Sequence, residues 1–298
     1  MTSVFEPSDP VRGLTFLPSG ETPWTGLVAA ALSDGGFDIF SVEGEAIASA
    51  PGPVLNGLAA APDFPLRGEQ FPLLFGADTN GALRGFAVIQ QAGEVVELPL
   101  EGDEAIESAA GVCRYSAGIG YVEIAVLAED AEAVVFRIRD TGGDGLTLAE
   151  TARIALPFAA KTCAAAGDDL IVGDPNAGLA RVDMSGETRA FRAGVSVSDV
   201  AYSELLGRPS VLAASAETGV LTVFDATTLE TATEIVFEEG LNAPAIAQPV
   251  ALALTGQSYG GMAFSSGLVA VYDRSDSRIK LVAREVVSRA VVSGGETG

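Results

Sequence analysis

The chain has 298 residues, 48% of them hydrophobic, and its 40 acidic and 17 basic side chains give a net charge of −23 at pH 7. A surface this negative repels nucleic acid and anionic lipid and favours divalent cations, basic partners or simply solubility. The absence of histidine excludes a Ser-His-Asp triad, a histidine general base and a histidine metal site.

No stretch approaches the roughly 20 apolar residues that a membrane span needs. The opening segment, MTSVFEPSDPVRGL, lacks the basic-then-apolar pattern of a signal peptide. We therefore expect no membrane span, and a protein that stays where it is made unless a signal was removed.

One alternating strand pattern, usually centred on an aromatic residue, recurs along the chain. Its copies are GGFDIFSV around Phe40, ALRGFAV around Phe86, EAVVFRI around Phe136, AGLARV around Ala180, GVLTVFD around Phe224 and GLVAVYD around Tyr272. Successive copies are 46, 50, 44, 44 and 48 residues apart, with no helical period between them. A repeat of about 45 residues built from strands is typical of a β-propeller.

Each repeat divides into four predicted strands, and the copies above are the third strands. First strands are expected from Gly13, Gly57, Gly111, Thr162, Asp199 and Pro249, second strands from Gly26, Phe71, Tyr121, Asp169, Ser210 and Gly260, and fourth strands from Glu45, Glu94, Leu146, Thr188, Thr231 and Ile279. Glycine, aspartate and serine between third and fourth strands are hairpin signals.

The sequence thus predicts one all-β domain over residues 1–298, a six-bladed β-propeller of four-stranded antiparallel blades. We expect the tail, residues 293–298, to be disordered. The segment through Pro10 is predicted either to be disordered or to close the ring by pairing with the last blade.

Two cysteines, Cys113 and Cys163, fall on the predicted innermost strands of neighbouring blades. They could form a disulfide, which would imply an oxidising compartment, or remain two buried thiols. Spacing alone does not decide between these alternatives.

Acidic residues follow the second strands of five blades, where the loops of a propeller share one face. They are Asp34, Asp78, Asp130, Glu132, Asp174 and Glu217. Converging carboxylates could bind calcium or magnesium at this rim. Alternatively, these residues occur there because turns favour aspartate, asparagine and glycine.

The chain resembles the β-propeller phytases, a six-bladed family. The specific segment is LNGLAAAPDFPLRGE, Leu55–Glu69, which is similar to the start of that family's second blade. GGFDIFSVEGE, Gly35–Glu45, resembles the glycine, the aliphatic-aromatic strand and the acid-glycine turn of that family. Over the other blades the resemblance is one of architecture and spacing. It implies hydrolysis of phytate with several bound calcium ions, and a periplasmic or secreted location if a signal was removed, otherwise a cytoplasmic one.

Few of the family's functional residues carry over. Asp174 keeps an acid at a matching carboxylate position, with Glu132 as a second candidate and Asp199 beside a third. Other metal or tyrosine positions correspond to Ala59, Ala110, Thr162 and Ser198, and the basic phosphate-binding loops correspond to Ser33–Gly36, Asp78–Gly81 and Glu129.

Phytate is highly negative, so its site must supply cations. Uncompensated carboxylates repel phosphate by on the order of 1 kcal/mol per close pair in water. We therefore expect a degenerate, non-catalytic member that binds a protein partner or a small non-phosphate ligand on a propeller face. Arg12 and Lys161 are expected to pair with rim acids such as Asp174.

Two alternatives remain open. One is a divergent calcium-dependent phosphohydrolase, a 3-phytase, that uses Asp174, Glu132 and Asp199. The other is a structural subunit of a larger assembly.

Overall fold

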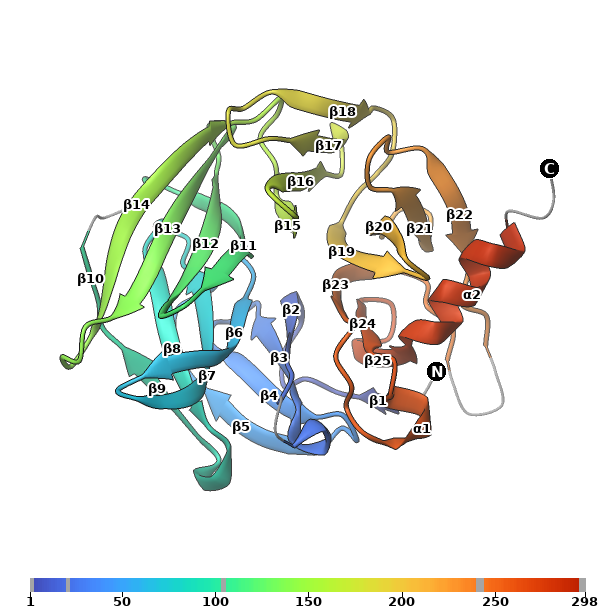
Figure 1. Cartoon of the computed structure of the whole chain (residues 1–298). Helices are drawn as coiled ribbons and strands as arrows, with labels where there is room; N and C mark the ends of the chain where they lie inside the picture. Colours follow the sequence, from blue (N-terminus) through green and yellow to red (C-terminus); the bar gives the residue numbers. More distant parts are fainter. Residues whose placement is uncertain (1–2, 20–21, 103–105, 240–243, 295–298) are drawn as a thin grey trace.

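Six antiparallel β-sheets stand around a common axis as the blades of a propeller (Figure 1). The structure is a computed structural model that describes residues 3–19, 22–102, 106–239 and 244–294. The predicted six-bladed, all-β architecture is confirmed.

Blades 1 to 3 contain strands in the predicted order, from the axis outward. Blade 1 is β2 (Val11–Leu17), β3 (Leu27–Leu32), β4 (Phe37–Ser41) and β5 (Ala46–Ala50), and blade 2 is β6 (Ala59–Leu66), β7 (Glu69–Ala77), β8 (Leu83–Ile89) and β9 (Glu94–Leu98). Blade 3 is β11 (Ala109–Gly118), β12 (Tyr121–Ala128), β13 (Glu132–Asp140) and β14 (Leu146–Ala155), with a short fifth strand, β10 (Leu100–Gly102), parallel to β14.

Blades 4 and 5 repeat this pattern. Blade 4 is β15 (Thr162–Ala166), β16 (Asp169–Asp174), β17 (Gly178–Val182) and β18 (Thr188–Arg192), and blade 5 is β19 (Asp199–Leu205), β20 (Arg208–Ser215), β21 (Val220–Asp225) and β22 (Thr231–Ile235). In blades 1, 3 and 5 the register shifts immediately before Phe40, Phe136 and Phe224, so these three phenylalanines occupy matching third-strand positions.

Blade 6 differs from the prediction by one strand. Its order from the axis is β23 (Pro249–Thr255), β24 (Leu268–Asp273), β25 (Arg278–Ala283) and β1 (Ser3–Phe5). Tyr272 therefore lies in a second strand, and its predicted equivalence to Phe40 is wrong. The cause is ring closure: β1 pairs antiparallel with β25, Val4 opposite Lys280, and supplies the outer strand. Pairing of the opening segment with the last blade is confirmed.

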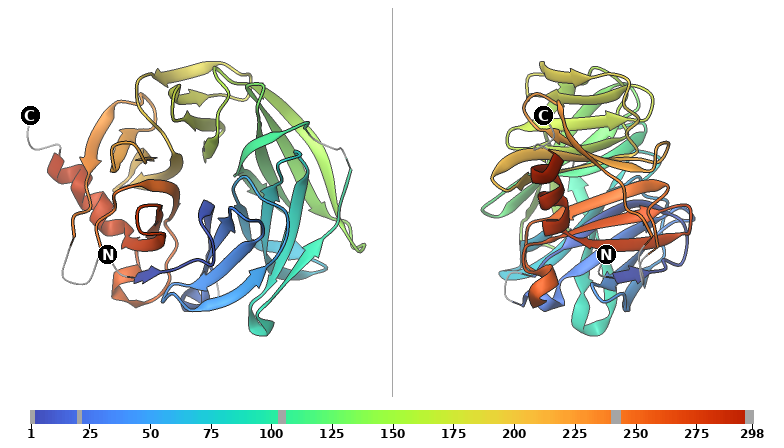
Figure 2. Two further views of the ribbon diagram at one scale, coloured as in Figure 1. Left: turned by 180° about the vertical axis from the view of Figure 1, so that it is seen from behind. Right: turned by 90° about the vertical axis from the view of Figure 1, so that its right-hand side faces the viewer.

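The helical segments are short, and one contradicts the prediction. The segment expected to form a strand from Gly260 contains helix α1 (Gly261–Phe264) instead. The predicted last strand stops at Ala283 and continues as helix α2 (Arg284–Gly294), which lies outside blades 5 and 6 (Figure 2). α2 thus takes in the first two residues of the predicted disordered tail, and residues 295–298 lie outside the described residues. Two 3₁₀ turns, Pro23–Thr25 and Gln90–Ala92, complete the elements.

The apolar core lies between the blades. The second strand of blade 1, Leu27–Leu32, is buried along its whole length because both of its faces meet neighbouring blades. Small residues let the first strands approach: a Cβ on Gly13 would lie 2.7 Å from the Cα of Gly57. Buried apolar faces of this kind stabilise a ring whose blades cannot bury them alone.

Candidate functional site

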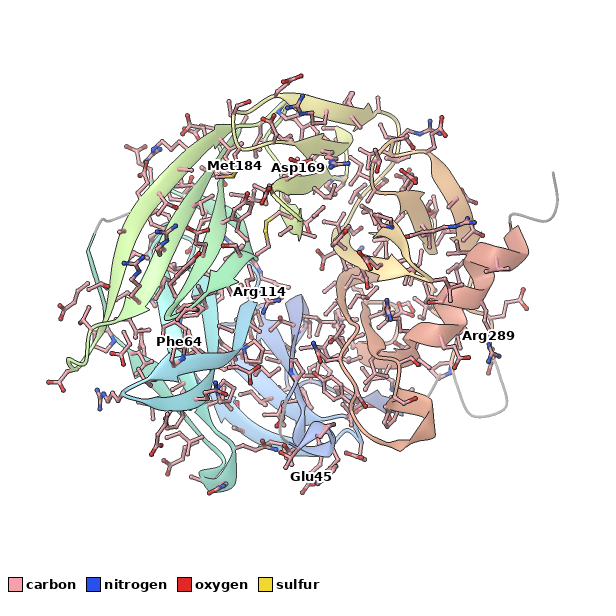
Figure 3. All side chains as sticks on the ribbon, viewed as in Figure 1. Glu45, Phe64, Arg114, Asp169, Met184 and Arg289 are labelled. Atoms are coloured by element: carbon pink, nitrogen blue, oxygen red, sulfur yellow. A yellow bond between two sulfur atoms is a disulfide. The ribbon has the colours of Figure 1, made fainter. Side chains whose placement is uncertain are left out.

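The first strands of the six blades line a central channel with a cavity volume of about 1190 Å³. We call the face where these strands begin the top face, and the face where they end the bottom face. Arg114 points into the open centre of the ring (Figure 3). The Arg114 side chain is exposed to the channel, and the surrounding channel walls lower its pKa by partial desolvation, an effect that the charge of Asp63 opposes.

Asn56 joins three blades at the top face. Its Oδ1 accepts a hydrogen bond of 2.7 Å from Nη1 of Arg12 in blade 1, and its Nδ2 donates one of 2.7 Å to the carbonyl of Ala109 in blade 3. The predicted salt bridge from Arg12 to a rim acid is not among the contacts of the described residues. Arg12 serves as a structural donor to an amide.

Asp199 joins three blades on the other side of the channel. Its Oδ1 accepts from the hydroxyl of Thr162 in blade 4 and, at 2.8 Å, from the amide of Val200, and its Oδ2 accepts at 2.7 Å from the amide of Leu252 in blade 6. Burial raises the pKa of Asp199 to about 6, although the three hydrogen bonds act in the opposite direction. The carboxylate of Asp199 therefore has a structural role.

The two cysteines form a disulfide between the innermost strands of blades 3 and 4. The Cα atoms of Cys113 and Cys163 are 5.7 Å apart, and both residues line the channel. Of the two alternatives that the sequence leaves open, the structure therefore contains the bonded one. The spacing of the repeat predicts that the two cysteines lie on neighbouring inner strands. Whether they form a disulfide depends on the distance between their Cα atoms, which only the folded structure gives.

Asp174 and Asp78 are buried and hold their own turns. Oδ1 of Asp174 accepts from the amides of Asn176 and Ala177, at 2.8 and 2.9 Å. Oδ1 of Asp78 accepts from the second and fourth residues after it, and its Oδ2 lies 3.4 Å from Arg84. Both aspartates therefore stabilise turns in the structure. This agrees with the alternative that aspartate occurs in these loops because turns favour it.

The remaining predicted rim residues are scattered. Glu132 pairs with Arg153 at 3.1 Å, and Asp34, Asp130 and Glu217 are exposed. Lys161 lines the channel, and among the described residues it makes no ion pair, so its predicted salt bridge is also not formed.

The three predicted metal ligands lie in three different blades: Glu132 in blade 3, Asp174 in blade 4 and Asp199 in blade 5. Within the part of the chain that the structure describes, no three acidic or cysteine side chains form a metal-binding group. Each of these three carboxylates accepts at least one hydrogen bond from the protein, and the structure does not bring the three together at one point.

Sequence reasoning missed Asn56 and Arg114. Asn56 precedes Gly57, and such a pair is readily interpreted as a turn rather than as a link between blades. Arg114 is a single charge in an otherwise apolar inner strand, which is a detectable signal for a channel-lining residue.

No model of a known protein family matches the chain, and no curated protein sequence matches it. Among solved structures, BBS1N in complex with ARL6DN, soaked with mercury, has a TM-score of 0.54 at 12% identity, covering 86% of this chain and 74% of that chain. The same complex soaked with lead has a TM-score of 0.51 at 13% identity, with the same coverage. These similarities support the propeller fold. No described helix has the length and apolar character of a membrane span.

Proposed function

We propose that this propeller is a non-catalytic binding module whose ligand is a protein. The observation that carries the proposal is the use of the candidate metal carboxylates by the fold: Asp174 holds a turn, Glu132 pairs with Arg153, and Asp199 links three blades. A carboxylate already occupied by protein donors has fewer lone pairs for a calcium ion.

A protein ligand is favoured by the kind of surface the molecule exposes. Large apolar side chains such as Trp24 and Ile119 are exposed in turns between strands. Exposed apolar side chains of this size are typical of protein–protein interfaces, and they would contribute little to the binding of a water-soluble small molecule. BBS1N, which shares the fold, is seen in complex with ARL6DN, which is compatible with a protein-binding role. Descent from the phytases remains part of the proposal and rests on Leu55–Glu69, which forms the start of blade 2.

The first test measures catalysis. Purified protein is incubated with phytate near neutral pH, with and without millimolar calcium, beside an active phytase and an Asp174→Ala variant. We expect no phosphate release and no large rise in melting temperature with calcium. Calcium-dependent turnover that Asp174→Ala abolishes would instead support the phosphohydrolase alternative.

The second test measures binding. The immobilised protein should retain one partner in stoichiometric amount from an extract of its source, and the purified pair should co-elute on gel filtration. Failure to form any such complex would remove the support for a binding module.

A further inference from the structure

Two opposite charges line the channel without forming an ion pair. Arg114 of blade 3 and Asp63 of blade 2 both line the cavity, and both residues are exposed. The charge of Asp63 acts on Arg114, yet among the described residues neither side chain makes a hydrogen bond or an ion pair. A guanidinium has five N–H donors and a carboxylate has about four acceptor sites, so both groups are available to a ligand.

A β-bulge holds Asp63 at the channel wall. The register of β6 on β7 shifts between Ala61 and Phe64, so Pro62 and Asp63 together lie opposite one residue of β7. Phe64, directly after the bulge, is buried in the core between blades 2 and 3. A bulge bends its strand and changes the direction of a side chain, and the buried neighbour fixes the strand beside it.

A second bulge follows Arg114. The register of β11 on β12 shifts between Arg114 and Ser116, which leaves Tyr115 without a partner in β12. The hydroxyl of Tyr115 donates a hydrogen bond of 2.6 Å to the carbonyl of Asp168 in blade 4. Cys113, on the other side of Arg114, is joined to blade 4 by the disulfide. Arg114 is therefore held between two residues that are both anchored in blade 4.

Bulges in the middle of an inner strand are specific to blades 2 and 3. The inner strands of blades 4 and 5, β15 and β19, pair without a register shift, and those of blades 1 and 6 shift only at their first residues. Bulges are frequent next to active sites, where they direct a side chain. Six equivalent blades would need neither bulge, so we interpret both as parts of one binding site.

From this arrangement we infer that the channel binds a free α-amino acid, with its carboxylate on Arg114 and its ammonium group on Asp63. A guanidinium binds a carboxylate with two parallel hydrogen bonds, and an ammonium group donates to a carboxylate. A zwitterion satisfies both residues, whereas a simple anion would be repelled by Asp63 and a simple cation by Arg114. A zwitterion also has no net charge, so a protein with a net charge of −23 does not repel it.

The rest of the wall favours an apolar side chain on the ligand. Pro62 and Tyr115, which adjoin the two charges, line the channel, as do Val112 and Tyr202. A largely apolar wall with a few placed polar groups is the usual composition of a small-molecule site, and a volume of about 1190 Å³ admits any amino acid. This site goes beyond the proposed function, which concerns a protein partner.

The first experiment compares ligands on the wild-type protein. Isothermal titration calorimetry measures binding of L-phenylalanine and of L-leucine, for which we expect a dissociation constant of about 1 mM or below. N-acetyl-L-phenylalanine lacks the ammonium group, and L-phenylalaninamide lacks the carboxylate. Each should bind at least about tenfold more weakly than phenylalanine, because one charge in the channel is then left without its partner.

The second experiment assigns each ligand group to its residue. Asp63→Asn and Arg114→Gln should each weaken binding of L-phenylalanine about tenfold. In Asp63→Asn the acetylated ligand should bind as well as phenylalanine does, and in Arg114→Gln the amide should, since the missing charge then has no partner to lose. The matched controls are Glu129→Gln and Lys161→Gln, which remove an acid and a base that line the channel at the top face and should change the affinity less than about twofold.

Several outcomes would overturn the inference. Absence of measurable binding of both amino acids to the wild type would do so, as would equal affinity for phenylalanine and its two derivatives. Tighter binding of the acetylated ligand would make Arg114 a site for simple carboxylates and reject the amino acid. Equal losses in the two variants and the two controls would reject Arg114 and Asp63 as the site. The protein partner takes no part in these titrations, so the binding module and the channel site succeed or fail separately.

Discussion

Asn56 and Asp199 join opposite halves of the ring in the same manner, each linking its own blade to the blade on either side. Asn56 connects blades 1, 2 and 3 through Arg12 and the carbonyl of Ala109. Asp199 connects blades 4, 5 and 6 through Thr162 and the amide of Leu252. The disulfide spans the junction of blades 3 and 4, so polar or covalent links join each blade to the next from blade 1 to blade 6.

Replacing Asn56 by alanine should lower the free energy of unfolding by about 1–3 kcal/mol, because two hydrogen bonds are lost and a carbonyl is left without its donor. Urea unfolding measures the change. The control is Asn80→Ala in an exposed turn of the same blade, which should cost less than about 0.5 kcal/mol. Equal losses in the two variants would show that the link through Asn56 contributes nothing.

Stability should depend on pH through Asp199. Its pKa is about 6 in the fold and near 3.8 when unfolded, so the folded state binds the proton more tightly. Stability from this group therefore falls as pH rises from about 4 to 6, and is regained on acidification. Relative to an Asp199→Asn variant, the wild type should gain about 1 kcal/mol between pH 7 and pH 5. Parallel pH profiles of the two proteins would contradict the assignment.

Reduction of the disulfide should destabilise the ring. The two cysteines are 50 residues apart, and a cross-link of this span stabilises by about 2–4 kcal/mol in chain-entropy terms. A thiol reductant should lower the melting temperature of the wild type and leave a Cys113→Ala/Cys163→Ala variant unchanged. An equal effect of the reductant on both proteins would mean that it acts elsewhere.

Leu206→Asn should stabilise the isolated protein by about 0.5–1 kcal/mol, since asparagine tolerates the left-handed turn and adds no exposed apolar surface. Leu206 and Arg67 have φ values of +52° and +53° in equivalent turns of blades 5 and 2. Arg67→Asn should stabilise less than Leu206→Asn, because it also removes the ion pair of Arg67 with Asp144. Thermal unfolding of both variants measures the gain. A loss of stability in Leu206→Asn would indicate that Leu206 packs within the fold.

The sequence predicts five blades strand by strand because each contains its own four strands, with glycine and aspartate between them. It misplaces the sixth because GLVAVYD around Tyr272 would suit a second or a third strand equally well. Only the long-range pairing of β1 selects between them. The helical spacing of Val287 and Val291, both buried, was a local signal that could have identified α2.

The candidate site was harder to predict than the fold. An acidic residue in a turn can bind a metal ion or stabilise the turn, and both roles look the same in the sequence. Asp174 has the structural role, since its Oδ1 accepts hydrogen bonds from two amides of its own turn. Asp199 was identified as a functional candidate for its chemistry, but its partners come from two other blades and cannot be inferred locally. The exposed leucine at position 206 is also not recognisable from sequence, because its backbone angle is a property of the folded turn.

Closure of blade 6 by β1 also has a consequence for biosynthesis. Glu6, which follows β1, pairs with Arg278 at a separation of 272 positions. At roughly 5–20 residues per second, the ribosome needs about 14–54 s to make that interval. Throughout that time β1 lacks its partner strand. Once β25 has been made, the outer edge of β25 stays unpaired until β1 docks on it. An open edge of this kind invites pairing with another nascent chain. Synthesis on crowded polysomes is therefore the stage at which this protein is most exposed to intermolecular strand exchange.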